Sequence, residues 1–465
     1  MRIEQYYLEC LSQASYLIAD DASGLAAVVD PRRDVEEYLA DAAAGGLRIE
    51  YVIETHFHAD FLSGHLELAA ATGAQIIFGD AAAPGFPARL VHDGERIRMG
   101  ETELEFLATP GHTPESISVV VRDLAGRGDG ERPDPVAVLT GDTLFIGDVG
   151  RPDLLASVGV SADELGAALH DSLHRKLLTL PDDTLVYPAH GAGSACGKNL
   201  SAETVSTIGR QRVENYALAP MAVEDFVALV TAEQPAAPDY FLYAATTNRD
   251  GHELLSVADV PAVDPAEALE LAADGAVLLD VRSANEFAAG HLVGSIDVGL
   301  DGRFAEFVGM VVGPLDDVVV ITSDEAQAAE ATLRMARIGF DRVVAKVVGI
   351  EAALAADPSA SSVASRLTAT ALRERRALVD GLCVVDVRND GERAIDSIEG
   401  TVHIPLAELP RRVGELDLDR PIVVHCAGGY RSSIAASWLR AHGARDVSDL
   451  LGGIAAWRST EQLVS

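Results

Sequence analysis

The first half of the chain alternates short apolar runs with polar turns that contain Gly or Pro. The runs are rich in Val, Ile and Leu, which is typical of buried strands. Four of these apolar runs are predicted strands: 49–53, 104–108, 136–139 and 185–187. The spacing of apolar residues also predicts helices at about 35–44 and 162–178, and Gly45-Gly46 ends the first of them. Strands and helices that alternate in this way indicate an α/β fold.

Side chains of the kinds that bind metals follow four of these strands. The segment 55–61 reads Thr-His-Phe-His-Ala-Asp-Phe and follows the first. The other three are followed by His112, Asp142 and His190, each next to Gly or Pro. Each of these residues alone could be an ordinary turn residue. Imidazole and carboxylate groups at four strand ends instead indicate one metal site at the rim of a sheet.

The second half of the chain contains an internal repeat. Residues 277–282 (Val-Leu-Leu-Asp-Val-Arg) recur as 383–388 (Cys-Val-Val-Asp-Val-Arg), and the apolar run 318–321 recurs at 422–425. Each copy is about 100 residues long, and strand–helix alternation within it predicts a small parallel α/β domain. The stretch 236–260 holds Pro, Asp, Asn and Gly, so we place the boundary between the two halves there.

Length and charge limit the classes of function. The 465 residues suffice for about three domains, and 48% apolar content supports packed cores. Acidic residues outnumber basic residues by 72 to 36, so repulsion makes nucleic acid and anionic membranes poor partners. With no signal peptide and no apolar run near the roughly 20 residues that span a bilayer, we expect a soluble cytoplasmic protein. The widely separated cysteines suit free thiols in a reducing compartment: Cys10, Cys196, Cys383 and Cys426.

The strand-end motifs, taken in order, resemble the metallo-β-lactamase superfamily. They are His-x-His-x-Asp at 56–60, Pro-Gly-His-Thr at 110–113, Gly-Asp-Thr at 141–143 and Pro-Ala-His-Gly at 188–191. The resemblance covers roughly residues 1 to 245 and implies an αβ/βα sandwich with its metal at the strand ends. The superfamily's two-metal hydrolases usually have His directly after the Asp, where this chain has Phe61. The resemblance therefore implies the mononuclear persulfide dioxygenase branch, whose three ligands match His56, His112 and Asp142.

The types of ligand in this set limit the choice of metal. Two histidines and one carboxylate with open positions suit non-haem Fe(II), and Zn is the alternative. His58 and Asp60 are interpreted as groups that orient the ligands and bound water. They and His190 also stay candidate metal ligands.

Two further residues fit this branch. Arg151 lies in a segment where the family places an Arg next to the active site. It either contacts substrate or braces its loop by pairing with Asp153. Cys196 lies in a loop of small residues shortly after His190. It is either a side chain that handles sulfur or an incidental thiol in a tightly packed loop.

The two copies in the second half resemble rhodanese domains, over about residues 261 to 465. In the second copy a strand is followed by Cys426, Ala427, Gly428, Gly429, Tyr430 and Arg431. Backbone N–H groups of such a loop, together with the helix dipole, favour a thiolate and hold an anionic persulfide sulfur. Arg431 adds a positive charge, and its spacing from Cys426 matches sulfurtransferase loops. We therefore interpret Cys426 as catalytic and not as a buried structural thiol.

The first copy lacks these groups. Thr322 stands at the position of the Cys and Gln327 at that of the Arg, and the glycines are gone. Asp324 and Glu325 put acidic side chains at the helix start, where they would repel a bound sulfur anion. We expect an inactive rhodanese domain with a spacing or docking role.

The combination resembles the persulfide dioxygenase–sulfurtransferase fusions of bacterial sulfide detoxification. We expect a metallo-β-lactamase-type sandwich at 1–250, an inactive rhodanese-like domain at 261–358 and an active one at 365–465. The implied reaction is Fe(II)-dependent oxidation of a low-molecular-weight thiol persulfide by O2 to sulfite and thiol. Cys426 would then pass sulfane sulfur to sulfite, which gives thiosulfate. The expected partners are the persulfide, O2 and sulfite, and we expect a homo-oligomer.

Two other functions stay open. The first half could be a Zn-dependent thioester hydrolase like glyoxalase II, although Phe61 argues against it. The second half could be a sulfur-carrier or persulfide-sensing module that docks a partner and has no turnover of its own.

Overall fold

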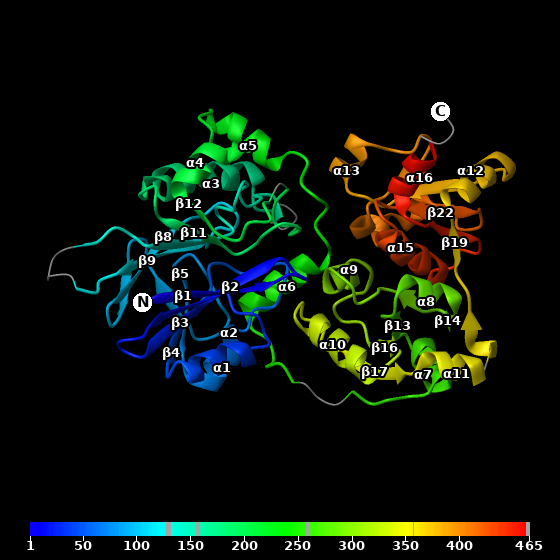
Figure 1. The fold of residues 1–465 in the computed structure, drawn as a ribbon, viewed down its shortest axis with the longest axis horizontal. Helices are drawn as coiled ribbons and strands as arrows, with labels where there is room; N and C mark the ends of the chain where they lie inside the picture. Colours follow the sequence, from blue (N-terminus) through cyan, green and yellow to red (C-terminus); the bar gives the residue numbers. More distant parts are fainter. Residues whose placement is uncertain (127–131, 155–158, 199, 257–259, 357, 462–465) are drawn as a thin grey trace. The chain divides into compact units, whose positions relative to one another are not determined.

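The computed structural model describes residues 1–126, 132–154, 159–198, 200–256, 260–356 and 358–461. The chain divides into two compact units: Met1–Pro235 with Phe241–Ser256, and Ala236–Tyr240 with Val257–Ser465 (Figure 1). Parts of the predicted boundary stretch 236–260 and of the predicted segments 1–250, 261–358 and 365–465 lie outside the described residues. Within the described ranges, no helix is both long enough and apolar enough to cross a membrane.

The first unit is built on two sheets of six strands. The first sheet has the order β1-β2-β3-β4-β5-β6, with β1 (Arg2–Leu8), β2 (Gln13–Asp20), β3 (Leu25–Val29), β4 (Arg48–Ile53), β5 (Gln75–Gly79) and β6 (Arg89–Val91). The second has the order β12-β11-β10-β9-β8-β7, with β7 (Arg96–Met99), β8 (Thr102–Ala108), β9 (Ile117–Asp123), β10 (Ala137–Gly141), β11 (Leu185–Pro188) and β12 (Ser206–Thr207). The helices are α1 (Glu36–Ala44), α2 (His65–Thr72), α3 (Ala162–Arg175), η2 (Leu177–Thr179), α4 (Ile208–Glu214), η3 (Tyr216–Leu218), α5 (Val223–Thr231) and α6 (Tyr240–Asp250).

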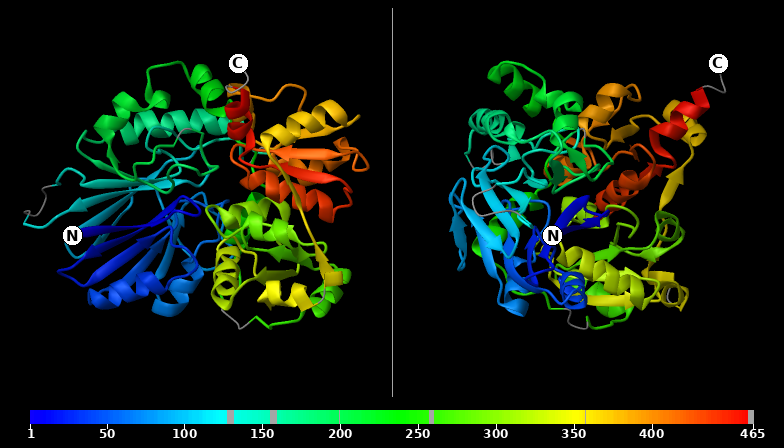
Figure 2. Two further views of the ribbon diagram at one scale, coloured as in Figure 1. Left: turned by 45° about the vertical axis from the view of Figure 1, so that its right-hand side comes forward. Right: turned by 60° about the vertical axis from the view of Figure 1, so that its left-hand side comes forward.

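Strands of this sandwich bury side chains on both faces. In β3, Val29 belongs to the core between the two sheets, whereas Val28 belongs to a cluster with Tyr38 of α1. In β9, Val119 points to the inter-sheet core and Val120 packs in the cluster that includes α3 and α5. Successive side chains of a strand point to opposite faces, so strands covered on both sides read as continuous apolar runs. The helices accordingly lie on the outer faces of the two sheets (Figure 2).

Strand direction brings the predicted metal ligands to one edge of the second sheet. Both β8 and β10 run antiparallel to β9, and β10 runs parallel to β11. The C-terminal ends of β8, β10 and β11 therefore lie at the same edge, and these ends precede His112, Asp142 and His190. A backbone hydrogen bond from Ile117 N–H to the Thr55 carbonyl ties this edge to the segment after β4.

The second unit contains two parallel sheets, one for each copy of the repeat. The first has the order β15-β13-β16-β17, with β13 (Val277–Asp280), β15 (Ile296–Asp297), β16 (Val318–Thr322) and β17 (Val343–Val348). The second has the order β19-β23-β22-β20-β21, with β19 (Ser365–Leu367), β20 (Cys383–Asp386), β21 (Val402–His403), β22 (Ile422–His425) and β23 (Val447–Leu450). A small antiparallel pair joins β14 (His291–Leu292) to β18 (Ser361–Ser362).

Helices surround both sheets of the second unit. The first copy has α7 (Pro265–Ala273), α8 (Ala284–Ala289), α9 (Phe304–Val311), α10 (Glu325–Ala336) and α11 (Ile350–Ala356), and η4 (Pro358–Ala360) follows it. The second has α12 (Ala369–Leu378), α13 (Asp390–Ile395), η5 (Leu406–Glu408), α14 (Leu409–Arg412), η6 (Val413–Glu415), α15 (Tyr430–Ala441) and α16 (Gly453–Glu461). Each copy contains an equivalent ion pair: Asp280 with Arg282 at 2.6 Å in the first, and Asp386 with Arg388 at 2.7 Å in the second. The internal repeat predicted from the sequence is therefore a repeat of structure.

Candidate functional site

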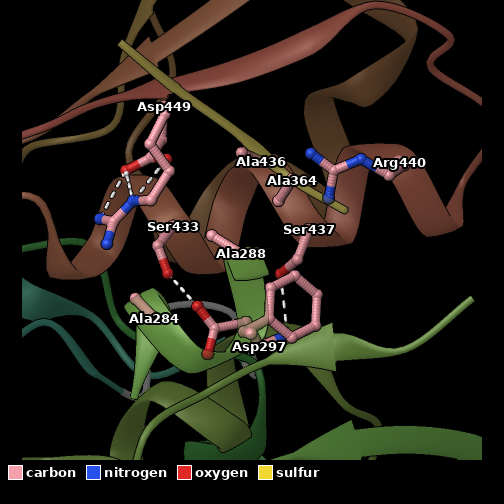
Figure 3. Close-up of a pocket in the computed structure, with 11 residues that line it drawn as sticks. Ala284, Ala288, Asp297, Ala364, Ser433, Ala436, Ser437, Arg440 and Asp449 are labelled. Atoms are coloured by element: carbon pink, nitrogen blue, oxygen red, sulfur yellow. Dashed lines mark hydrogen bonds and ion pairs between the residues drawn. The ribbon is translucent and has the colours of Figure 1, made fainter. Parts of the chain in front are cut away.

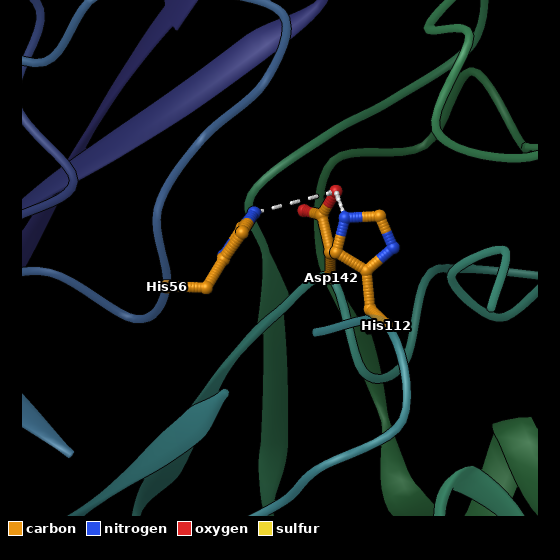
Figure 4. Close-up of side chains that lie close together, drawn as sticks. All are labelled: His56, His112 and Asp142. Atoms are coloured by element: carbon orange, nitrogen blue, oxygen red, sulfur yellow. Dashed lines mark ion pairs between the residues drawn. The ribbon is translucent and has the colours of Figure 1, made fainter. Parts of the chain in front are cut away.

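The structure brings together His56, His112 and Asp142 from three strand ends (Figure 4). The Nε2 atom of His112 lies 3.5 Å from Asp142 Oδ2, and His56 Nε2 lies 3.9 Å from the same oxygen. All three side chains are buried. Metal–ligand bonds of about 2.0–2.2 Å place neighbouring ligand atoms about 3–3.6 Å apart, close to the spacing seen here.

Hydrogen bonds orient the two imidazoles for metal binding. His112 Nδ1 lies 2.9 Å from the Arg151 carbonyl oxygen, and His56 Nδ1 lies 2.9 Å from Thr55 Oγ1. A carbonyl oxygen only accepts, and the Thr55 hydroxyl already donates to Asp30. Both Nδ1 atoms therefore carry the proton, and both Nε2 atoms present a lone pair towards Asp142.

The electrostatics of the group also fit a cation. Burial lowers the pKa of His112 to about 4 and that of His56 well below its usual range, so both rings are neutral ligands at pH 7. Burial also raises the pKa of Asp142 to about 6. Among the described residues, no donor forms a hydrogen bond of ordinary geometry with either Asp142 oxygen. Because a buried carboxylate without such partners is costly, this donor set fits a bound metal ion.

A second group of candidate ligands lies beside the first. His190 Nε2 is 3.5 Å from Asp142 Oδ1 and 3.5 Å from Asp60 Oδ2, and its Nδ1 donates to the Ser12 carbonyl. His58 faces Asp30 at 3.1 Å and Glu54 at 3.6 Å. Although burial disfavours its charged form, carboxylates led by Asp30 raise the pKa of His58 to about 9. A cationic imidazole has no lone pair for a metal, which favours the interpretation of His58 as a supporting group.

The second candidate site is the loop between β22 and α15. Cys426 is 2% exposed, and its Sγ accepts a hydrogen bond from Gly429 N–H at 3.1 Å. Ser432 Oγ lies 3.5 Å from the same sulfur. Gly429 has a φ of +106°, a left-handed conformation that a side chain would strain. The thiol therefore lies at the start of a helix, where it accepts a hydrogen bond from one backbone N–H group and has a serine hydroxyl beside it.

Comparison with known proteins identifies the families to which the two halves of the chain belong. The model of the metallo-beta-lactamase superfamily matches residues 8–190, and that of the rhodanese-like domain matches residues 264–355 and 368–460. The human mitochondrial persulfide dioxygenase ETHE1 is 31% identical over 241 residues, which cover 50% of this chain and 82% of the human protein. The chain belongs to the persulfide dioxygenase–rhodanese fusions of the metallo-beta-lactamase superfamily. The predicted family and fold class are thereby confirmed.

Two further similarities frame the fusion. A solved metallo-beta-lactamase structure from Staphylococcus aureus has a TM-score of 0.67 and 32% identity, and the match covers 75% of this chain and 98% of that one. This share exceeds the length of the first unit, so the likeness extends into the second. A hydroxyacylglutathione hydrolase from Rhodospirillum rubrum is 31% identical over 238 residues, covering 50% of this chain and 80% of that protein. The first half of the chain is therefore similar to a relative named as a hydrolase as well as to one named as a persulfide dioxygenase.

Phe61 stands at the position where the sequence comparison above led us to expect a histidine in a two-metal site. Its side chain is 1% exposed, and its ring centroid lies 4.4 Å from that of His58. Its carbonyl oxygen accepts a hydrogen bond from Asn248 of α6, which also donates to the His58 carbonyl. Asn248 was not predicted from the sequence, because nothing local marks an amide that is 190 residues away from His58.

Arg151 pairs with Asp153. This pair belongs to the predicted alternative in which Arg151 braces its loop. Its Nε and Nη2 atoms donate to the two Asp153 oxygens, both at 2.7 Å. Its Nη1 donates to the carbonyls of Ala195 and Pro235, at 3.2 and 2.6 Å. Since its carbonyl orients His112, the contacts favour a bracing role for this residue in the fusion.

Cys196 lies at the metal group in the fusion. Its thiol, Asp142 and His190 have candidate ligand atoms within 4.8 Å of one another. Burial, followed by the negative charges of Asp60 and Asp142, raises the pKa of the thiol. Cys196 therefore lies close to the candidate metal ligands, and both its predicted sulfur-handling role and its alternative as an incidental thiol in a tightly packed loop stay predictions.

The persulfide loop differs from expectation in one respect. Arg431 donates two hydrogen bonds to Glu392, at 2.6 and 2.7 Å, so its positive charge is shared with a carboxylate. No local sequence pattern marks Glu392, which lies on α13. In the first copy, Thr322 Oγ1 donates to the Asp324 carbonyl, and the Asp324 side chain accepts from Gln327 N–H. That carboxylate occupies the helix N-terminus that holds the sulfur in the second copy.

Asp30 is a site residue that sequence reasoning passed over. It ends β3 with a φ of +51°, which is uncommon for a residue with a side chain. Its carboxylate accepts from Thr55 N–H and Thr55 Oγ1, at 2.8 and 2.9 Å, and faces His58. An acidic residue between a strand end and a Pro was the same signal that marked the other site residues.

We expect Asp30→Asn to weaken metal binding about ten- to hundredfold, because an amide provides one acceptor and no charge. Affinity is measured by chelator competition. The matched control is Asp20→Asn, since Asp20 is also a buried strand-end carboxylate and accepts from backbone N–H groups of Ser23 and Glu101. Unchanged affinity in Asp30→Asn would show that Thr55 and His58 keep the ligands in place without it.

Proposed function

We propose that the fusion oxidises a low-molecular-weight thiol persulfide with O2 on a mononuclear Fe(II), and that its second unit transfers sulfane sulfur to sulfite. The first activity is assigned to residues 1–250, with His56, His112 and Asp142 as the metal ligands. The second is assigned to residues 365–465, with Cys426 as the sulfur carrier. Residues 261–358 form an inactive rhodanese domain.

The observation that carries the proposal is the group of His56, His112 and Asp142, together with Phe61 at the position after Asp60. A second metal would need an imidazole where Phe61 places a phenyl ring, and the neighbouring His58 faces carboxylates that favour its cationic form. A mononuclear site with two histidines and one carboxylate leaves positions for substrate and O2. A Zn-dependent two-metal hydrolase, which the hydrolase relative supports equally by identity, would need that imidazole.

The oxidation balances as persulfide plus O2 plus water giving thiol, sulfite and two protons. When bound, Fe(II) supplies the activation of O2. His56 and His112 keep their lone pairs on the metal side because Thr55 and the Arg151 carbonyl hold their protons. The candidate ligands are buried, and Cys196 lies beside Asp142 and His190, so we assign it a contact with the sulfur of the bound substrate.

The transfer step uses the Cys426 loop. A thiol persulfide first exchanges its outer sulfur onto Cys426 and leaves as a thiol. Sulfite then attacks this sulfur, a new S–S bond forms as the bond to Cys426 Sγ breaks, and thiosulfate departs. Cys426 keeps the electron pair as a thiolate, which the N–H of Gly429 and the nearby Ser432 hydroxyl stabilise. Production and use of sulfite in one chain raises its local concentration.

The experiment that tests the whole proposal is O2 consumption by the Fe(II)-loaded protein. Persulfides of glutathione, coenzyme A and cysteine are compared as substrates, and sulfite and thiosulfate are quantified. O2 uptake with sulfite formation supports the dioxygenase. Zinc in the protein as isolated, with thioester hydrolysis and no O2 uptake, would instead establish the hydrolase.

Phe61→His is expected to raise the zinc content of the protein from about one to about two ions per chain, because it restores the missing imidazole beside Asp60 and His190. Metal content is measured by elemental analysis after zinc loading. Phe57→His is the control, since Phe57 belongs to the same motif but packs against Phe78, with ring centroids 4.8 Å apart. Two ions in the wild-type protein would remove the argument from Phe61.

A further inference from the structure

The helix that carries the persulfide loop is held by the inactive copy. Tyr430, the first residue of α15, donates to the Gly299 carbonyl, and Ser433 donates to Asp297. One turn further, Asp297 N–H donates to Ser437 Oγ at 2.9 Å, and Trp438 Nε1 donates to a first-copy carbonyl. Figure 3 shows Ser433 and Ser437 of α15 beside Asp297. The four residues repeat at helical spacing, so they share one side of α15, which faces the first copy.

This face bears directly on the thiol. Ser432 Oγ lies 3.5 Å from Cys426 Sγ, and the adjacent Ser433 is bonded to the first copy. Gly429, whose N–H donates to the sulfur, immediately precedes α15. The position of both hydrogen-bond partners of the sulfur therefore depends on where α15 is held.

Asp297 is the most unusual residue in this contact. In the strand register, Asp297 of β15 stands opposite Asp280 of β13. In the second copy the equivalent position, opposite Asp386, is occupied by His403. His403 bonds within its own copy, to the Arg388 carbonyl at 2.7 Å. Asp297 instead turns to α15.

Burying the ionised carboxylate of Asp297 at this position costs folding free energy. It is buried, and burial together with the nearby Asp280 charge raises its pKa to about 7, although Ser433 opposes the shift. Its Oδ1 atom has no hydrogen-bond partner in the described ranges. The cavity beside it measures about 10 Å³, which admits nothing larger than a water molecule. The cavity is therefore no ligand site, and stability of the first copy alone does not explain the residue.

We propose that the inactive rhodanese copy serves to position the catalytic helix of the active copy, with Asp297 as the positioning residue. The inference rests on the proposed sulfur transfer through Cys426. It gives the first copy a role within the same reaction, as the fixed surface against which the persulfide loop is aligned.

The test compares variants of the full-length protein in thiosulfate-to-cyanide sulfur transfer. Asp297→Ala is expected to lower kcat about tenfold and to change KM for thiosulfate less than about twofold, because alignment is lost and binding is not. Asp297→Asn keeps an acceptor for Ser433 and should retain kcat within about twofold. Asp316→Ala is the matched control, since Asp316 is exposed on the same copy and bonds to Gly313 N–H.

A second measurement separates positioning from plain stability. The rate of Cys426 alkylation by iodoacetamide, followed by mass spectrometry of its peptide, should fall severalfold in Asp297→Ala. Lower thermal stability with unchanged kcat and alkylation would overturn the proposal. If Asp297→Ala does not fold, Ser433→Ala removes the same hydrogen bond with a smaller change, and wild-type kcat and alkylation there would also overturn it.

The two proposals fail in different ways. A wild-type protein that transfers no sulfur would contradict the proposed function. The alkylation rates of Cys426 would still show whether Asp297 sets the position of the thiol.

Discussion

Cys426→Ser is expected to abolish sulfur transfer, by at least about a thousandfold, and to leave persulfide-dependent O2 uptake unchanged. Serine has nearly the same shape, so the loop and the Gly429 donor keep their places. Its hydroxyl, however, is a far weaker nucleophile at neutral pH and cannot carry a persulfide. The measurement is thiosulfate-to-cyanide transfer and O2 uptake on the same preparation.

The matched control is Cys383→Ser, because Cys383 begins β20 of the same copy and is half-buried away from the loop. It should retain full transfer. In the coupled assay, Cys426→Ser should release sulfite from persulfide and form thiosulfate at no more than the rate without enzyme. Thiosulfate formation at the wild-type rate would mean that the second unit is a sulfur carrier or sensor and not a catalyst.

The sequence was sufficient for the parts of the site whose chemistry is local. His56, His112, Asp142 and Cys426 each combine a reactive residue type with a strand end and a neighbouring Gly or Pro. Residues at such positions can be predicted to share a site, because strand direction brings successive strand ends to one edge of a sheet. The strands themselves were equally predictable, since burial on both faces leaves continuous apolar runs.

The residues that sequence reasoning missed act through tertiary contacts. Asn248 holds the backbone of the metal motif from a helix 190 residues later, and Glu392 reaches Arg431 from α13. Neither has a local pattern, because an amide or a carboxylate on a helix surface is ordinarily solvated. Asp297 could not be predicted for another reason. Its hydrogen-bond partners, Ser433 and Ser437, lie in the other copy of the repeat.

Asp142→Asn is expected to empty the metal centre and to lower persulfide-dependent O2 uptake at least about a hundredfold. The amide keeps the shape of the side chain but loses the charge that complements the cation between His56 and His112. Sulfur transfer by Cys426 should stay at the wild-type rate, because its loop lies in the second unit. Metal content by elemental analysis and O2 uptake are measured together.

The same change has an opposite expected effect on stability without metal. The Asp142 carboxylate is buried and has no hydrogen-bond donor of ordinary geometry among the described residues, so the metal-free protein bears an uncompensated charge. A neutral amide removes that charge. Metal-free Asp142→Asn should therefore unfold at a temperature no lower than metal-free wild type, whereas metal should stabilise only the wild type.

Asp60→Asn decides which carboxylate is the metal ligand. Asp60 lies near His190 and is the alternative carboxylate in the second group, with His190 Nε2 at 3.5 Å. If Asp142 is the ligand, Asp60→Asn keeps its metal and loses only part of its O2 uptake. Loss of metal in Asp60→Asn, with metal and activity retained in Asp142→Asn, would place the ion on His58, Asp60 and His190 instead. That result would also end the argument from Phe61, since the second group would then bind metal without an imidazole at that position.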